Sequence, residues 1–344
     1  MNVIEIMNTI RDQASQAYRD SIPELTRNNL EDVRFAMISD DNVMVANEFT
    51  NALLNKVFKS HIISRRFVNP LKSLKKGKKP LGDTVEEIYV NFAKGEEYDP
   101  NVGAAMLERT LPDVKTLYHR MNYQMKYRQT FSQAALSKAF SSFANLESYF
   151  SGIIDSMYNK ADQDEFLNMK QILKSALDAN AMKKVEISDP MLSAANAQEF
   201  IKTVKTVSGL MVFPSSDWNG YLTAQNTDTK PITTFTPKSE QVLIIDTATD
   251  TSVSVDVLAN TFNMTVAEFN DTRKIVIDVF PDPTMRAAIV DEQFFQIWDD
   301  LFVFKSFDNP EGLYDNYYLH VWQTLAYSIL VNAVAFCVAA EAGA

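Results

Sequence analysis

Several residue types on which large protein classes depend are scarce in this sequence. One cysteine, Cys337, occurs in 344 residues, which excludes a disulfide framework and fits a reducing compartment. Only 9 residues are glycine, which argues against folds built on glycine-rich phosphate-binding loops. The net charge of −11 opposes binding of free nucleic acid. The remaining composition, 46% hydrophobic and 22% charged, is typical of a globular protein.

Targeting signals and long apolar segments are also missing. The N-terminal stretch is amphipathic and carries Glu5, Arg11 and Asp12, which is unlike a secretory signal peptide. The longest apolar run, at 328–340, is too short to span a bilayer. We expect this run to form a buried strand.

Residues suited to catalysis are sparse and scattered. The three histidines, His61, His119 and His320, lie far apart and lack metal-ligand spacing. Adjacent acids such as Glu86 and Glu87 would point to opposite faces of a strand, so they make a poor acid–base pair. A buried, inert thiol is expected for Cys337. We therefore assign no catalytic, metal-binding or cofactor-binding residue, and we expect no cofactor.

Charge is strongly polarised in one part of the chain. Residues 56–79 contain nine Lys or Arg and no acid, whereas residues 83–113 contain eight acids and two bases. Two readings are open, namely solvated loops of opposite sign or a contact arm whose halves face oppositely charged neighbours. A nucleic-acid patch is disfavoured because the acids adjoin it.

The same part of the chain has the alternation of β-strands. Ile88, Val90 and Phe92 alternate with polar residues, and residues 117–128 carry their apolar side chains at odd positions. One strand of that length would span roughly 40 Å. If the two strands pair, they form a long two-stranded arm, which is marginally stable alone in water. Its apolar face then needs cover from the same chain or from another copy.

The rest of the chain reads as a mixture of helices and strands. An apolar stripe indicates a helix of about 35 residues, ~50 Å long, within 133–180. Further helices are expected at 44–58, at 198–207 and, in two pieces, at 256–269. Strands are expected at 242–245, 274–280 and 287–290, with several more within 301–336. Residues 214–238 are expected to form an exposed loop.

Four blocks of sequence carry a resemblance to a known family. They are FVNPLKSLKKGKKPLGDTVEEIYVN (67–91), LPDVKTLYHRMNYQMKYRQTFSQ (111–133), VDVLANTFNMTVAEF (255–269) and GLYDNYYLHVWQTLAYSILVNAVAF (312–336). In these blocks, which occur in family order, the chain resembles the major capsid proteins of phi29-type short-tailed bacteriophages. The first 30 residues and 214–238 match less well.

The resemblance implies an α+β chain with the HK97-like capsid fold. Its parts would be an N-terminal arm at 1–61, an extended E-loop hairpin at 62–130, a peripheral domain with a long spine helix at 131–191, an axial domain at 192–290 and a return to the peripheral domain at 291–344. We expect no C-terminal immunoglobulin-like domain of the kind that the family prototype carries.

The implied function is that of a phage head protein, not an enzyme. Copies would form pentamers and hexamers that close into an icosahedral shell around double-stranded DNA, in virions assembled in the host bacterial cytoplasm. Expected partners are other copies, a scaffolding protein, a portal and head-decoration proteins, with no membrane and no sequence-specific DNA contact. The residues expected to contact neighbouring subunits are Lys72, Lys75, Lys76, Lys78, Lys79, Glu86, Glu87, Glu96, Glu97, Met121 and Tyr123.

Two other functions remain as alternatives. A cellular nanocompartment shell of the encapsulin type would share the fold but enclose an enzyme. A carboxylate-dependent cytoplasmic hydrolase would need two acids that converge in a pocket, and the sequence offers no such spacing.

Overall fold

The structure is a computed structural model of the chain. It describes residues 67–79, 84–98, 109–132, 143–224, 230–260, 273–309, 311–312 and 314–339, together with parts of 4–33. Two compact units are present, unit 1 with Met1–Asn69, Gln124–Glu165 and Leu301–Trp322, and unit 2 with Pro70–Tyr123, Phe166–Asp300 and Gln323–Ala344. The helix expected at 44–58 and the second helical piece expected before 269 lie outside the described residues.

Unit 1 contains the first part of a long helix and most of three strands. The strands are β4 (Tyr123–Ser132), β9 (Phe295–Asn309) and β10 (Tyr314–Tyr327), and the sheet order is β1-β9-β10-β4. Helix α6 (Phe143–Asp178) has 36 residues, which confirms the long helix expected from the apolar stripe. In unit 1 that stripe is buried at Ile154, Tyr158 and Ala161. The short helix α2 (Gln16–Ser21) is capped by the Ser15 hydroxyl.

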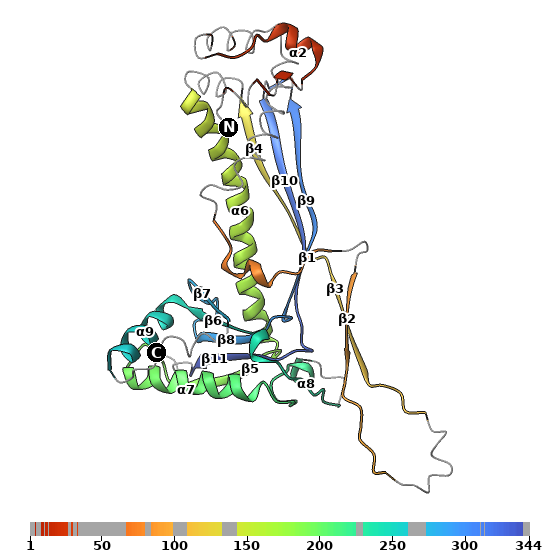
Figure 1. The fold of residues 1–344 in the computed structure, drawn as a ribbon, viewed down its shortest axis with the longest axis vertical. Helices are drawn as coiled ribbons and strands as arrows, with labels where there is room; N and C mark the ends of the chain where they lie inside the picture. Colours follow the sequence, from red (N-terminus) through yellow and green to blue (C-terminus); the bar gives the residue numbers. More distant parts are fainter. Residues whose placement is uncertain are drawn as a thin grey trace. The chain divides into compact units, whose positions relative to one another are not determined.

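Unit 2 is built on a five-stranded sheet of order β5-β11-β8-β6-β7 (Figure 1). The strands are β5 (Lys183–Ile187), β6 (Gln241–Asp246), β7 (Arg273–Ile277), β8 (Met285–Asp291) and β11 (Ala333–Val338). The pairs β5–β11 and β6–β7 are parallel, and β8 is antiparallel to both of its neighbours. The apolar run at 328–340 thus contains a buried strand, as expected.

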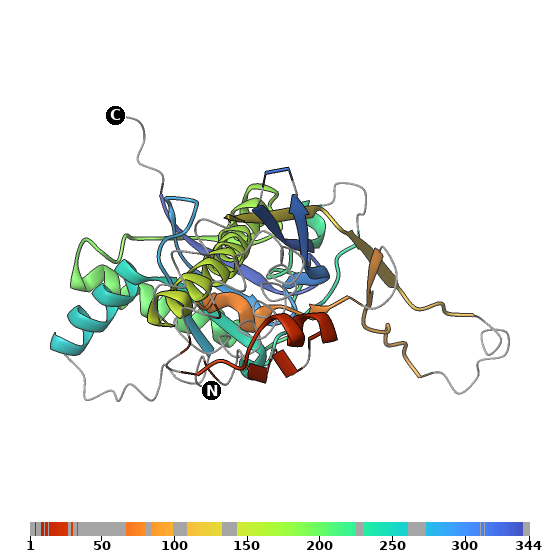
Figure 2. The ribbon, with the colours of Figure 1, turned by 90° about the horizontal axis from the view of Figure 1, so that it is seen from above.

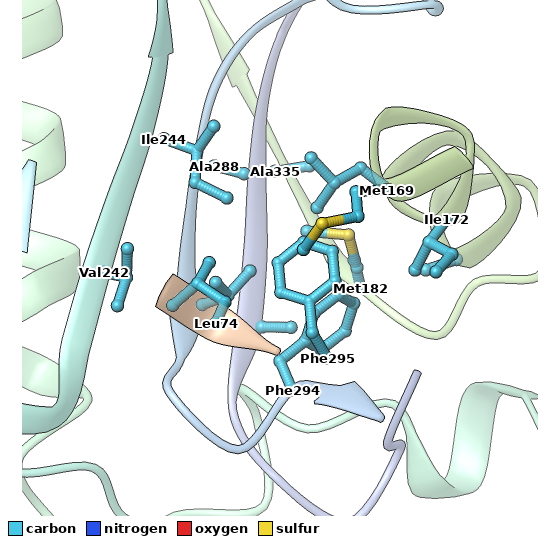
Figure 3. Packing of buried hydrophobic residues seen from close by; sticks show 14 of the residues in the cluster. Leu74, Met169, Ile172, Met182, Val242, Ile244, Ala288, Phe294, Phe295 and Ala335 are labelled. Atoms are coloured by element: carbon cyan, nitrogen blue, oxygen red, sulfur yellow. The ribbon is translucent and has the colours of Figure 1, made fainter. Parts of the chain in front are cut away.

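Both faces of this sheet are covered, which is why its central strands read as continuous apolar runs. Helices α7 (Ala194–Leu210) and α9 (Thr247–Asn260) pack on one face. There the rings of Phe200 and Phe336 meet edge to face, with their centroids 6.1 Å apart. The other face packs against the second half of α6. Figure 3 shows Met169 and Met182 beside the rings of Phe294 and Phe295 in this core.

The alternating segment at 117–128 is two strands rather than the single strand expected. Strand β3 (Val114–Arg120) pairs with β2 (Thr84–Val90), whereas β4 belongs to the four-stranded sheet. Asn122 ends β3 because its carboxamide acts as a substitute peptide group: Nδ2 donates to the carbonyl of Leu325 and Oδ1 accepts from its N–H, each at 2.8 Å. The arm is therefore shorter than the alternation indicated.

The segment at 214–238 is also different from the exposed loop expected. Ile232 and Thr236 are fully buried, and Ser215 forms a β-bridge with Thr234. Asn219 Nδ2 donates to the carbonyl of Ile232 at 3.1 Å and to the Thr234 hydroxyl at 3.0 Å. Polar side chains that satisfy one another are stable inside a protein, so polar composition did not imply exposure here.

The remaining short elements connect these parts. They are the 3-10 helices η2 (Pro70–Leu74) and η4 (Lys238–Glu240), strand β1 (Gly77–Lys78) and helix α8 (Tyr221–Ala224). In the part of the chain that the structure describes, we find no helix that is long and apolar enough to cross a membrane.

Candidate subunit interface

Strands β2 and β3 form a two-stranded antiparallel ribbon in unit 2 (Figures 1 and 2). The register runs from Thr84 opposite Arg120 to Val90 opposite Val114. Even-numbered residues therefore pair with even-numbered residues and share one face. This register places Ile88 and Val90 of β2 on the same face as Val114 and Tyr118 of β3, and it places Leu117 of β3 on the opposite face with Tyr89.

The inner face of the ribbon, which carries the odd-numbered residues, contacts the body of its own unit. Tyr89 and Leu117 pack against the main core cluster. The Tyr89 hydroxyl donates to the carbonyl of Thr233, and burial raises the pKa of this tyrosine. Glu87 Oε2 lies 2.9 Å from His119 Nε2, and the Ser328 hydroxyl donates to Glu87 Oε1 at 2.5 Å. This chain thus covers its own inner face.

The order in which hydrogen bonds connect Ser328, Glu87 and His119 bears on the hydrolase alternative. The Ser328 hydroxyl donates to the Glu87 carboxylate and not to the His119 ring. A hydrolytic triad needs the imidazole between nucleophile and acid, because the imidazole must take the hydroxyl proton. The observed order is that of a structural hydrogen-bond cluster.

The outer face of the ribbon, which carries the even-numbered residues, is exposed in the single chain. The exposed fractions are 57% for Ile88, 56% for Val90, 45% for Val114 and 65% for Tyr118. The Tyr118 hydroxyl donates to Glu86 Oε1 at 3.0 Å, and this bond to a carboxylate raises the pKa of Tyr118. Exposed apolar side chains that share one face of a ribbon make that face a candidate interaction surface.

Residues 75–79, at the end of the basic segment, precede the ribbon and are bound to β9. Strand β1 pairs in parallel with β9, with Gly77 opposite Trp298, and Gly77 has a positive φ of 95°. Lys75 Nζ lies 2.8 Å from Asp299, and Lys79 Nζ lies 2.9 Å from Asp300. The two acids point to opposite faces of β9, so each meets a different lysine. These partners within the chain were not anticipated from the sequence.

Lys76 also turns toward its own chain. Its ammonium group donates to the Gln293 side chain and to the carbonyl of Glu292, the latter at 3.3 Å. Burial lowers the pKa of Lys76, although the nearby acids Glu292, Asp291 and Glu87 oppose this.

The other residues expected to contact neighbouring subunits divide by exposure. The side chains of Met121 and Tyr123 are half-buried in their own chain. The charged residues that lie exposed are Lys72, Lys78, Glu86, Glu96 and Glu97.

Asn91 fixes the end of the ribbon, and no pattern in the sequence points to it. Its N–H donates to the carbonyl of Asp113 at 2.8 Å and extends the ribbon by one pair. Its carboxamide donates to the carbonyl of Pro231 at 3.3 Å and accepts from the Thr233 N–H at 3.1 Å. The sequence around Asn91 could not indicate this role, because its partners at 231–233 lie about 140 residues away in the chain.

Reactive chemistry is weakly represented in the described residues. No three of their His, Cys, Asp or Glu side chains gather in a way that could hold a metal ion. Cys337 is fully buried, and burial raises the pKa of its thiol.

The fold itself is that of phage capsid proteins. The chain is similar to a chain in the capsid structure of Staphylococcus phage Andhra, with a TM-score of 0.63, 15% identity, and coverage of 81% of this chain and 86% of that one. A chain in the structure of the head fiber and inner core protein gp22 of native bacteriophage P68 gives the same TM-score and identity, with coverage of 80% and 86%. The class that this architecture defines is the HK97-like capsid fold.

Sequence comparison identifies the family. A family model described as Phi29-like phage major capsid protein matches residues 7–337. The major capsid protein of Bacillus phage PZA is 36% identical over 337 residues, covering 96% of this chain and 72% of that protein. The major capsid protein of Streptococcus phage Cp-1 is 25% identical over 351 residues, covering 96% and 92%. The chain belongs to the Phi29-like phage major capsid proteins, a family of structural virion proteins rather than enzymes.

Proposed function

We propose that this chain assembles through its β2–β3 ribbon into the pentamers and hexamers of an icosahedral phage head around double-stranded DNA. Family membership supports the shell, and it favours a phage head over the nanocompartment and the hydrolase. The observation that carries the role of the ribbon is its uncovered outer face, where Ile88 and Val90 are more than half exposed.

Apolar burial on this outer face supplies most of the affinity between subunits. A two-stranded ribbon is marginal alone, so a neighbouring copy that covers Ile88, Val90 and Val114 stabilises the ribbon as well as the contact. Burial contributes ~25 cal/mol for each Å² of apolar surface removed from water. Subunit association and ordering of the ribbon are therefore coupled.

Exposed charges set the register between copies. Lys72 and Lys78 meet acids of neighbouring subunits, and Glu86, Glu96 and Glu97 meet bases there. Met121 and Tyr123, which are half-buried in the single chain, add contact area beside the ribbon. Each exposed ion pair contributes only ~0–1 kcal/mol, so misplaced subunits can still dissociate during assembly.

The net charge of −11 suits a protein that encloses a polyanion without holding it. DNA can then slide along the inner wall during packaging and release. A scaffolding protein, a portal and head-decoration proteins complete the proposed set of partners, and assembly takes place in the cytoplasm of the host bacterium.

The test is a double substitution on the outer face, Ile88→Lys with Val90→Lys. We expect electron microscopy to show no shells, while circular dichroism shows that the subunits stay folded and ultracentrifugation shows that they stay small. Val279→Lys is the matched control, because Val279 is an equally exposed valine outside the ribbon, at 59%. Normal shells from the ribbon variant would contradict the role of the outer face.

A further inference from the structure

Glu87 is one of the points at which the ribbon is joined to the body of unit 2, and it joins both strands. It lies on β2, and its Oε2 atom binds His119 on β3 at 2.9 Å. Its Oε1 atom accepts from Ser328 at 2.5 Å. One carboxylate thus connects three segments that are far apart in sequence.

The third segment is firmly attached to the core. Ser328 is fully buried, its N–H donates to the carbonyl of Phe294 at 2.8 Å, and its hydroxyl accepts from the Leu330 N–H at 3.1 Å. Phe294 and Leu330 belong to the main core cluster. A hydrogen bond to Ser328 is therefore a connection to the main core cluster of the unit.

The geometry assigns Glu87, His119 and Ser328 as a latch that fixes the direction in which the ribbon leaves the subunit body. The contact between Glu87 and His119 joins β2 to β3, and the bond from Ser328 to Glu87 joins both strands to the core. This inference rests on the proposed function, since a ribbon that binds neighbouring copies must point the same way in every subunit. The three residues act through the ribbon and are positioning residues rather than contacts between subunits.

A side chain with two hydrogen-bonding atoms is the appropriate one for this position, because one atom meets His119 and the other meets Ser328. The Glu87 side chain is 17% exposed and that of His119 is 9% exposed. A low-dielectric setting makes hydrogen bonds stronger than they are in water. Leu117 packs against the core, but apolar packing lacks the directionality that sets an angle. The hydrogen bonds of Tyr89 and Asn91 to 231–233 are directional as well, and they hold the ribbon farther along β2 than the latch does.

The experiment measures the direction of the ribbon in unassembled subunits of the full chain. The chain has one cysteine, Cys337, which is buried, so cysteines introduced at Lys94 and Lys202 can be labelled selectively with nitroxides. Lys94 follows β2, and Lys202 lies on α7 in the same unit. Electron–electron double resonance then reports the distribution of distances between the two labels.

We expect one narrow distribution with the natural latch and a broad one in Ser328→Ala and in Glu87→Leu. Glu87→Gln keeps an acceptor for Ser328 and a polar partner for His119, so it is expected to restore the narrow distribution. Hydrogen exchange gives a second measure, and backbone amides of β2 and β3 should exchange about tenfold faster in Glu87→Leu. Unchanged distributions in both Ser328→Ala and Glu87→Leu would overturn the latch.

The matched control is Glu86→Leu, the neighbouring residue on the outer face, which should keep the narrow distribution. Equal broadening in this control would show that the latch is not specific and would also overturn it. This result does not depend on assembly. The proposal for the outer face would be contradicted by shells that form from the Ile88→Lys, Val90→Lys variant. The latch proposal would be contradicted by label distances in free subunits that do not change in the latch variants.

Discussion

Asp299 and Asp300 show how position along a strand decides the partner of a side chain. They are adjacent in β9, and alternation directs Asp299 toward Lys75 and Asp300 toward Lys79. Gln323 and Thr324 on β10 repeat the arrangement, donating to Asp299 at 3.0 Å and to Asp300 at 2.9 Å. Two acids that look like a pair in the sequence belong to two separate clusters.

Lys79 offers a direct test of the cluster around Asp300. The Lys79 side chain is 4% exposed and that of Asp300 is 12% exposed, so removal of the ammonium group leaves a poorly solvated carboxylate. We expect Lys79→Met to lower the free energy of unfolding by ~2–4 kcal/mol, because breaking a buried pair strands its partner. Chemical denaturation of free subunits measures this.

Lys78 is the matched control for this substitution. It is exposed and has no ion-pair partner among the residues that the structure describes. Lys78→Met should change the free energy of unfolding by no more than about 0.5 kcal/mol. Equal losses in the two variants would contradict the assignment of Lys79 to a buried pair.

Asp189 links stability to pH. Burial alone would raise the pKa of this carboxyl, but hydrogen bonds from Arg286, at 2.9 Å, and from the Met191 N–H outweigh it and lower the pKa. A lowered folded-state pKa stabilises the fold above the unfolded pKa of ~3.9, and this contribution is lost as pH falls through the folded value. Thermal unfolding measured from pH 7 downward should show that the melting temperature falls less steeply with pH in Asp189→Asn than in the natural chain.

At the scale of elements, periodicity predicted the long helix and the buried strands. Helix α6 formed because an apolar stripe runs without proline through 143–178, and β6 and β11 formed because both faces of their sheet are covered. The break between β3 and β4 at Asn122 was not predicted, because a carboxamide that replaces a peptide group leaves no periodic pattern in the sequence. The burial of Asn219 and Thr234 within 214–238 was missed for a related reason, since their polar groups bind one another.

Two glycines make a matched pair of substitutions in unit 2. A Cβ atom on Gly220 would overlap the backbone of Ala181, whereas one on Gly209 in α7 would meet no atom within 4 Å. Gly220→Ala should therefore cost ~1–3 kcal/mol of unfolding free energy, because the backbone must shift. Gly209→Ala should stabilise by up to about 1 kcal/mol through its helix propensity. Denaturant titration of both variants measures the sign of each change in the free energy of unfolding. Stabilisation by Gly220→Ala would contradict the close approach of Gly220 to Ala181.

At the scale of the whole molecule, assembly combines apolar contact with weak electrostatic selection. Glu96 and Glu97 lie exposed beyond β2, where they can meet a neighbouring copy. We expect Glu96→Lys with Glu97→Lys to slow assembly at low ionic strength, followed by light scattering. The difference should shrink near 1 M salt, where the Debye length falls to about 3 Å.

The control for net charge reverses two exposed acids elsewhere, Glu240→Lys with Glu311→Lys. It changes the total charge equally but leaves the ribbon as it is. Slowing of the same size in both variants would mean that net charge, and not the position of Glu96 and Glu97, governs the rate.

The sequence alone determined the family, the long helix and the presence of an alternating arm, because residue order and periodicity are local properties. The tertiary structure decided which surfaces remain free. The register of β2 against β3 placed Ile88 and Leu117 on opposite faces of the ribbon, and 231–233 and 328 came from distant parts of the chain to cover one of them. Pairing of strands and burial by remote segments depend on contacts across the chain, so no local pattern could show which apolar face is left for a neighbouring copy.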